Sequence, residues 1–285
     1  MSWFALTLLV GAAFLHMGWN LLMKQTAERY AVTWWALLVG SLCFFPLVVA
    51  SRAELRPVWG YALAGACFQL FYYMILGYAY QSSDFSLVYP LARGTAPVFI
   101  ALWAVLLLGE SLTWAGLVGL GSIVAGIVLI GAGAWRNSPQ HALKLSLSTV
   151  APFLIALCIS GYSVIDGAAV KQAPALPYTA LGLGLSVLLM TPLIWARYGW
   201  GTLKSVGREH WWRIVLIGLA TFAAYGLTLT AYGLAQVSYV GAVREVSIVL
   251  GALAGWLWLG EPFGLTRTIG ALIVAGGILI VTVAG

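Results

Sequence analysis

Five ionisable residues lie inside long apolar runs of this sequence. An ionised side chain in such a run is a candidate for binding or catalysis. The five residues are His16, Arg93, Asp166, Arg244 and Glu245. If these runs are membrane helices, each such group costs about 2.5–3.5 kcal/mol at a helix centre on insertion scales, which makes a functional role the first hypothesis. Most other basic residues stand at the ends of the runs, from where a long side chain can reach water.

Arg93 and Arg244 are the strongest candidates for binding a ligand. A guanidinium group stays protonated and presents a planar fork that fits a carboxylate or a phosphate. Two acids, Asp166 and Glu245, lie at a comparable depth in their runs. If all four groups ionise, the empty site is neutral overall. That balance suits a zwitterion whose anionic end meets an arginine and whose amine meets Asp166 or an aromatic face.

Polar and aromatic residues share helix faces with these charges, because positions i, i+3 and i+4 are neighbours on a helix. The predicted substrate-binding residues are Arg93, Arg244, Tyr89, Trp19, Asn20, Tyr72, Tyr162, Asp166, Tyr225 and Tyr232. The candidates for proton coupling are His16, Asp166 and Glu245. These faces would converge if the helices that carry them line a common cavity.

Each of these residues also has a structural interpretation. A tyrosine stripe can be helix packing, and His16 can be a hydrogen bonder between helices. Glu245 can neutralise Arg93 or Arg244 in a structural ion pair. Glu110 and Glu261 stand in tight turns, where we expect each to cap the helix that follows it.

The composition excludes a soluble domain. Of the 285 residues, 62% are hydrophobic and 8% are charged, whereas a soluble domain carries about 25% charged residues. The apolar runs are about 20 residues long and continuous, which favours membrane helices over a β-barrel. The three cysteines lie inside apolar runs without metal-ligand spacing, so we expect buried thiols and no metal. We expect no cofactor, and the sequence has no nucleotide-binding P-loop.

The fold class predicted from these runs is all-α, with ten membrane-spanning helices. They are placed near 2–23, 31–50, 58–80, 85–108, 112–134, 146–168, 177–197, 211–235, 238–259 and 263–284. Most connections are tight, such as 51–57 and 109–111, and the longest are 135–145 and 198–210. Ten spans put both termini on one side of the membrane.

The charged connections predict the orientation. The side opposite the termini receives Lys24, Arg29, Arg136, Lys144, Arg197, Lys204, Arg208 and Arg213, and the terminal side receives Arg52, Arg56 and Lys171. Basic residues concentrate in cytoplasmic connections. Both termini are therefore predicted to be non-cytoplasmic.

The two halves of the chain resemble each other. Leu106-Leu-Leu-Gly109-Glu110-Ser111-Leu112 matches Leu257-Trp-Leu-Gly260-Glu261-Pro262-Phe263, and the same shift of 151 residues superposes Arg93 on Arg244. We predict two repeats of five helices, 1–139 and 140–285. Because five is odd, the second repeat is inverted relative to the first. Inverted repeats imply a substrate site near the midplane of the membrane.

The paired Gly-Glu turns, the ten runs and the two-copy layout resemble the EamA family of the drug/metabolite transporter superfamily, over essentially the whole chain. The segments His16-Met-Gly-Trp19-Asn20 and Tyr162-Ser-Val-Ile-Asp166-Gly167 are similar to a bacterial branch associated with phosphonate utilisation. The resemblance implies a multi-pass protein of a bacterial-type inner membrane. It also implies cytoplasmic termini, which conflicts with the orientation that the connecting charges predict.

These observations predict a secondary transporter that moves a small anionic or zwitterionic metabolite, amino acid-like or phosphonate-like, by alternating access. The alternative is an exporter of aromatic or cationic compounds that uses tyrosines as a cage and Asp166 as the counter-ion. A lipid-modifying enzyme is disfavoured, because the three histidines are scattered and the connections hold no metal or acid-pair motif. The predicted partners are a small molecule and the lipid bilayer, with no nucleic acid. We expect a monomer and leave a dimer open.

Overall fold

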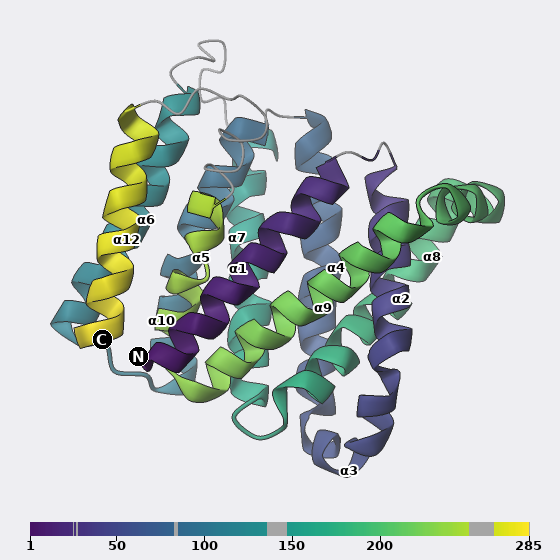
Figure 1. Ribbon diagram of the computed structural model, residues 1–285, viewed down its shortest axis with the longest axis horizontal. Coiled ribbons are helices and arrows are strands. Elements are labelled where there is room, and N and C mark those ends of the chain that lie inside the picture. The colour runs from purple at the N-terminus through teal and green to yellow at the C-terminus, as the bar shows by residue number, and fades with distance from the viewer. Residues whose placement is uncertain (25, 27, 83–84, 136–146, 251–264, 285) are drawn as a thin grey trace. The chain divides into compact units, whose positions relative to one another are not determined.

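The computed structural model describes residues 1–24, 26, 28–82, 85–135, 147–250 and 265–284. All regular secondary structure in this part of the chain is helical. Figure 1 shows the helices in order. They are α1 (Trp3–Lys24), α2 (Arg29–Ala50), α3 (Arg52–Leu55), α4 (Trp59–Ser82), α5 (Phe85–Leu108), α6 (Trp114–Trp135), α7 (Leu147–Ala169), α8 (Ala175–Glu209), α9 (Trp211–Leu234), α10 (Val237–Val243) and α12 (Leu265–Ala284).

Six helical segments among the described residues are long and apolar enough to cross a bilayer. They are Trp3–Met23, Arg29–Ala50, Arg52–Ile75, Val150–Ala169, Ala175–Glu209 and Trp211–Leu234. Three shorter apolar helical segments are Ala92–Leu108, Trp114–Ile130 and Thr268–Val283. Helices therefore occupy the predicted ranges in the part of the chain that the structure describes, apart from an interruption within 238–259, and the number of spans stays a prediction.

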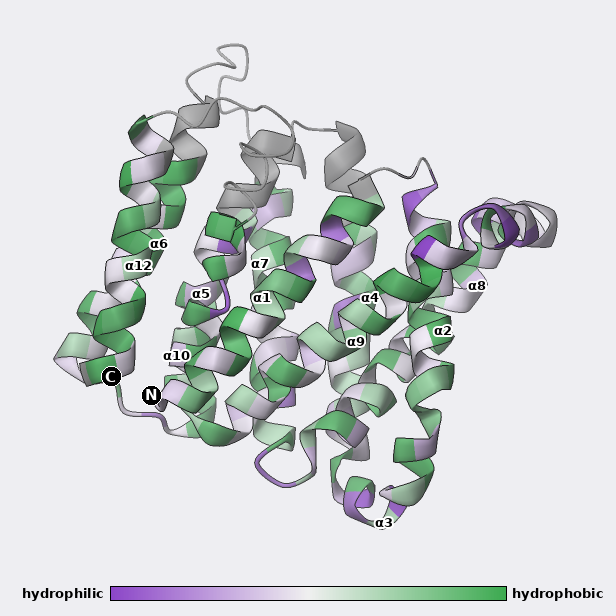
Figure 2. Ribbon diagram, in the orientation of Figure 1, coloured by the Kyte–Doolittle hydropathy of each residue, from purple (hydrophilic) through white to green (hydrophobic). Residues whose placement is uncertain are grey.

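Large apolar side chains point outward along these helices. Leu42 on α2 and Leu188 on α8 are 65% and 67% exposed, and Figure 2 shows α2, α9 and α12 as mostly hydrophobic along their lengths. Apolar surface of this extent is rare on soluble monomers and is typical of contact with lipid. The chain is accordingly an integral membrane protein.

The helices form two compact units, and each unit takes segments from both halves of the sequence. The first unit contains Met1–Thr7, Phe71–Val164 and Leu234–Gly285, and the second contains Leu8–Leu70 and Ile165–Gly233. The units therefore differ from the predicted repeats, 1–139 and 140–285. Since the repeats describe a duplication of sequence and not a compact body, that division stays a prediction.

The first unit is held together by the close antiparallel pair α6 and α12, which lie side by side in Figure 1. A Cβ atom at Gly126 would lie 2.6 Å from the carbonyl oxygen of Gly270, and one at Gly119 would lie 2.9 Å from that of Gly277. Small residues allow membrane helices to approach backbone to backbone in this way. α5 packs against α6 and α10 in the same unit.

The second unit is built on α2, α8 and α9. The indole Nε1 of Trp34 donates a hydrogen bond of 3.0 Å to Thr191 Oγ1, which joins α2 to α8. Phe44 on α2 stacks on Phe222 of α9 with ring centroids 5.1 Å apart. Gly40 makes this contact possible, because a Cβ atom there would lie 2.5 Å from the Phe222 ring.

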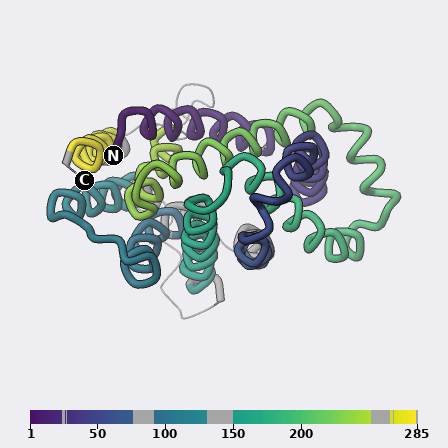
Figure 3. Tube along the Cα trace, turned by 90° about the horizontal axis from the view of Figure 1, so that it is seen from below, coloured from purple at the N-terminus to yellow at the C-terminus, as the bar shows by residue number. Residues whose placement is uncertain are grey.

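Two expected connections are helical instead. Residues 198–210, predicted as a long connection, continue as the second part of α8 after a sharp turn at Gly199, where φ is 66°. Figure 3 shows this change of direction in the green part of the trace. The segment is a helix because apolar Leu203 and Val206 are buried beneath its exposed polar residues. The connection 51–57 likewise contains α3 and a 3₁₀ turn at Arg56–Val58.

Candidate functional site

The predicted span 238–259 is not one continuous helix in the part that the structure describes. α10 ends at Val243, residues 244 and 245 form a turn, and residues 246–250 are helical again. The amide nitrogens of Glu245, Ser247 and Ile248 each donate to the carbonyl three residues earlier, at 2.9–3.4 Å, in place of the α-helical bond. The interruption places Arg244 and Glu245 at the break, where the prediction had a regular helix turn.

Glu245 is the centre of a buried charge cluster in the first unit. Its carboxylate has no exposed surface. Its Oε2 lies 2.8 Å from Nε of Arg93 on α5, and its Oε1 lies 3.7 Å from Nε of Arg244. One carboxylate is therefore shared by two guanidinium groups. The ion pairing that the sequence left open for Glu245 is therefore present, whereas its proton-coupling role stays a prediction.

Two serines accept hydrogen bonds from the arginines. Nη2 of Arg93 donates to Oγ of Ser247 at 3.1 Å, and Nη1 of Arg244 donates to Oγ of Ser163 on α7 at 3.3 Å. Neither serine was among the predicted site residues. Ser247 lies three residues after Arg244 and contacts Arg93 of α5. Ser163 directly follows the predicted Tyr162, and neither its residue type nor its spacing indicated a role in the site.

Tyrosines of α4 and α7 lie in the same unit. The ring centroids of Tyr72 and Tyr162 are 6.2 Å apart in an edge-to-face arrangement, and those of Tyr72 and Tyr73 are 5.1 Å apart. Such pairs add about 0.5–1.5 kcal/mol beyond the burial of their area. The predicted Tyr72 and Tyr162 are thus brought together.

Asp166 belongs to the second unit, at the end of α7, and is 3% exposed. Its Oδ1 accepts a hydrogen bond of 2.7 Å from the hydroxyl of Tyr178 on α8, and its Oδ2 accepts one from the hydroxyl of Tyr225 on α9. Gly65 on α4 leaves room for the carboxylate, since a Cβ atom there would lie 2.5 Å from Oδ1. Asp166 and Tyr225, two separately predicted site residues, are therefore in contact. Tyr178 and Gly65 were not predicted, because their spacing from Asp166 follows no helical period.

The remaining predicted residues lie on α1, α5 and α9. The rings of His16 and Trp19 on α1 meet edge to face with centroids 4.9 Å apart. Asn20 is exposed, and its Nδ2 donates to the carbonyl oxygen of His16 at 2.7 Å. Tyr232 on α9 is fully buried. The side chain of Tyr89 lies outside the described residues.

The prediction that Glu110 caps the helix that follows it is wrong. Glu110 does not cap α6, the helix that follows it; instead its carboxylate caps α10. Oε1 accepts from the amide of Val237 at 2.6 Å, and Oε2 accepts from the amide and hydroxyl of Ser238 at 3.1 and 2.6 Å. A carboxylate is favourable at any helix N-terminus that it can reach, and the close packing of α10 on α5 brings this one within reach. Glu261 lies outside the described residues.

Comparisons with known proteins agree with this architecture. The model of the EamA-like transporter family matches residues 3–132 and 148–283. The Pseudopaline exporter CntI of Pseudomonas aeruginosa (strain UCBPP-PA14) is 25% identical over 96% of this chain and 92% of its own length. The Uncharacterized transporter YwfM of Bacillus subtilis (strain 168) is 23% identical over 92% of this chain and 87% of its own length.

A solved crystal structure shares the fold at 21% identity. It superposes with a TM-score of 0.76 over 99% of this chain and 97% of that chain. The two family matches together cover most of the chain, and the apolar helices fit the multi-pass inner-membrane architecture of the family. The chain therefore belongs to the EamA-like transporter family, within the drug/metabolite transporter superfamily.

Proposed function

We propose that this chain is a secondary transporter of a small anionic or zwitterionic metabolite, amino acid-like or phosphonate-like, that works by alternating access. The observation that carries the proposal is the buried cluster in which Arg93 and Arg244 share the single carboxylate of Glu245. When all three side chains are ionised, they carry a net charge of +1. An incoming carboxylate or phosphonate would supply the second negative charge.

The geometry supports an arginine that can be recruited by a ligand. Nε of Arg244 is 3.7 Å from Glu245, a longer contact than the 2.8 Å that Arg93 makes. Arginine forks bind carboxylate and phosphate groups in pairs of parallel hydrogen bonds, each stronger than a neutral bond. The hydrogen bonds that an anion forms with Arg244 would therefore be stronger than the contacts that the anion displaces. Asp166, in the second unit, is proposed separately as a carboxylate that takes up a proton.

The break in the helix at Arg244 and Glu245 also supports a transport site. In secondary transporters, substrate and coupling-ion sites are commonly formed where a membrane helix is interrupted and its backbone groups face a cavity. The interrupted helix here carries two of the five ionisable residues found in apolar runs.

The close pair of α6 and α12 supports the inverted repeat. With the 151-residue shift, Gly119 corresponds to Gly270 and Gly126 to Gly277. The observed contacts are Gly119 with Gly277 and Gly126 with Gly270. This cross-pairing is what a two-fold axis requires when it relates two equivalent antiparallel helices. We propose that 1–139 and 140–285 are the two repeats and that one rocks against the other during transport.

The test is uptake into proteoliposomes, after a thermal-shift screen of amino acids, phosphonates, polyamines and quaternary amines has identified a stabilising solute. Arg93→Ala should lower transport by about 10- to 100-fold, because a hydrogen bond to a charged group is worth about 1.5–3 kcal/mol. Arg93→Lys keeps the positive charge without the guanidinium fork. Its transport rate should lie between those of the original protein and Arg93→Ala. The control is Arg52→Ala, which removes an exposed arginine. Unchanged transport by a folded Arg93→Ala protein would refute the proposal.

The second candidate is an exporter of aromatic or cationic compounds. It is favoured by Asp166, a buried carboxylate ringed by the hydroxyls of Tyr178 and Tyr225, and by a relative whose name describes an exporter. The same variant separates the candidates. A cation exporter should keep or raise its transport in Arg93→Ala and lose it in Asp166→Asn.

A further inference from the structure

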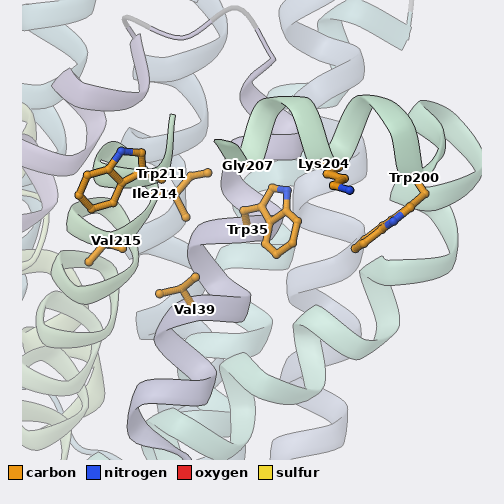
Figure 4. A pocket seen from close by; sticks show the side chains of 8 residues that line it. All are labelled: Trp35, Val39, Trp200, Lys204, Gly207, Trp211, Ile214 and Val215. Carbon is orange, nitrogen blue, oxygen red and sulfur yellow. The ribbon is translucent and has the colours of Figure 1, made fainter. Parts of the chain in front are cut away.

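The turn at Gly199 creates a cavity that the proposed transport site does not use. After this turn, residues 200–209 run back over the second unit toward α9. A cavity of about 340 Å³ opens between this segment, α2 and the start of α9. Figure 4 shows the side chains that line it.

One wall of the cavity is fixed by Trp35 of α2. Its indole Nε1 donates a hydrogen bond of 2.8 Å to the carbonyl oxygen of Leu203. Gly207 lies flat against the same ring, because a Cβ atom at Gly207 would come within 3.1 Å of the indole. The ring is therefore held between a backbone acceptor and a residue without a side chain. Specific contacts of Trp35 therefore form this wall of the cavity.

The cavity has a polar end and an apolar end. At the polar end, the side chain of Lys204 lies beside Trp35 and Trp200 in Figure 4, and these two rings have centroids 6.2 Å apart. Lys204 is exposed and forms no ion pair with any described residue. At the other end, Val39, Ile214 and Val215 line the cavity.

The surroundings place the polar end at the level of lipid headgroups. Trp200 and Trp211 are 51% and 64% exposed, and exposed tryptophans of membrane proteins gather at the interface between hydrocarbon and water. The guanidinium of Arg213 lies 5.1 Å from the ring centroid of Trp212, and Arg208 is exposed near the end of α8. The neighbourhood is rich in positive charge next to an apolar slot.

We propose that this cavity binds an anionic diacyl phospholipid. The headgroup phosphate meets the ammonium of Lys204, the glycerol region lies beside the rings of Trp35 and Trp200, and an acyl chain follows Val39, Ile214 and Val215. An unpaired lysine beside an apolar slot is complementary to a negatively charged amphiphile. A soluble anion would fill the polar end alone, and a zwitterionic lipid would gain less from Lys204.

The proposal is tested with the purified full chain in an uncharged detergent. Native mass spectrometry measures how much dioleoyl phosphatidylglycerol and dioleoyl phosphatidylcholine the protein retains, two lipids with the same acyl chains and different headgroup charge. Phosphatidylglycerol should be retained preferentially. Lys204→Gln should reduce this preference about fivefold, since one basic residue near a membrane surface contributes about that factor. Val215→Phe narrows the apolar end and should reduce retention of both lipids.

The matched control is Arg208→Gln, which removes one positive charge from the same segment without touching the cavity. It should change the preference less than twofold. Three results would overturn the proposal: equal retention of the two lipids by the original protein, an equal effect of Arg208→Gln and Lys204→Gln, or displacement of phosphatidylglycerol by soluble glycerol phosphate. The second result would mean diffuse attraction, and the third would mean a site for the anion alone.

Discussion

Glu245 illustrates the energetic cost of burying a charged side chain in this protein. Its carboxylate is fully buried and lies within 4 Å of two guanidinium groups. Desolvation of a charge in hydrocarbon is expensive, and the attraction between close partners offsets that cost only while both partners stay in place. Removing any one of the three side chains should therefore destabilise the other two.

Replacing Glu245 with glutamine should lower the free energy of unfolding by about 3–5 kcal/mol, because it leaves two buried guanidinium groups with one fewer negative partner. Chemical unfolding in detergent measures the change. Glu209→Gln is the control: Glu209 is exposed at the end of α8, so its effect should stay within about 0.5 kcal/mol. A loss below about 1 kcal/mol for Glu245→Gln would show that the carboxylate carries no charge in the folded protein.

The carboxylate of Asp166 depends on a glycine as much as on its hydrogen-bond donors. In Gly65→Ala the new methyl group would lie 2.5 Å from Oδ1, so the carboxylate must move away from at least one tyrosine hydroxyl. We expect a loss of about 1–3 kcal/mol in the free energy of unfolding. The same substitution at Gly60, also on α4, meets nothing within 4 Å and should be tolerated. Equal effects at the two positions would mean that Gly65 matters only for helix propensity.

At the scale of elements, the closest packing in the first unit lies between α6 and α12. In a membrane, helices gain no hydrophobic stabilisation from meeting each other, so close backbone contact and dispersion hold them together. Gly126 and Gly270 each oppose the other's carbonyl oxygen. Backbone atoms cannot rotate away as a side chain can, which makes these positions sensitive to any added atom.

Gly126→Ala should therefore push α6 and α12 apart and lower the free energy of unfolding by about 1–3 kcal/mol. Gly121→Ala on the same helix meets nothing within 4 Å, and it should be neutral or stabilise the protein by up to about 1 kcal/mol through helix propensity. Unfolding of the two variants under identical conditions gives the comparison. The pairing would be contradicted if both alanines had the same effect.

The positions of these elements followed from the sequence, and their interruptions did not. Runs of about 20 apolar residues predict helices such as α2 and α5 within two residues of their observed ends, because a bilayer sets their length. Gly199 ends the spanning part of α8 through one backbone angle, φ of 66°, and run length does not encode an angle. The hydropathy pattern likewise does not predict the break at Arg244 and Glu245.

The candidate site was predictable as a set of charges and not as a set of contacts. Arg93, Arg244 and Glu245 stood out because each is costly in hydrocarbon. The pairings of Arg93 with Ser247 and of Asp166 with Tyr178 depend on which helices pack together. Glu110 illustrates the same limit, since the helix that it caps lies more than 120 residues away in sequence.

At the scale of the whole molecule, the predicted ten spans and the lysine and arginine counts require both termini to lie outside the cytoplasm. Ser2 and Ser205 are exposed and should then lie on opposite sides of the membrane. In a chain with Cys43 and Cys67 changed to alanine, a membrane-impermeant maleimide applied to spheroplasts should label Ser2→Cys and leave Ser205→Cys unlabelled until the membrane is permeabilised. The reverse pattern would support cytoplasmic termini, and labelling of both from one side would contradict the seven spans predicted between Ser2 and Ser205.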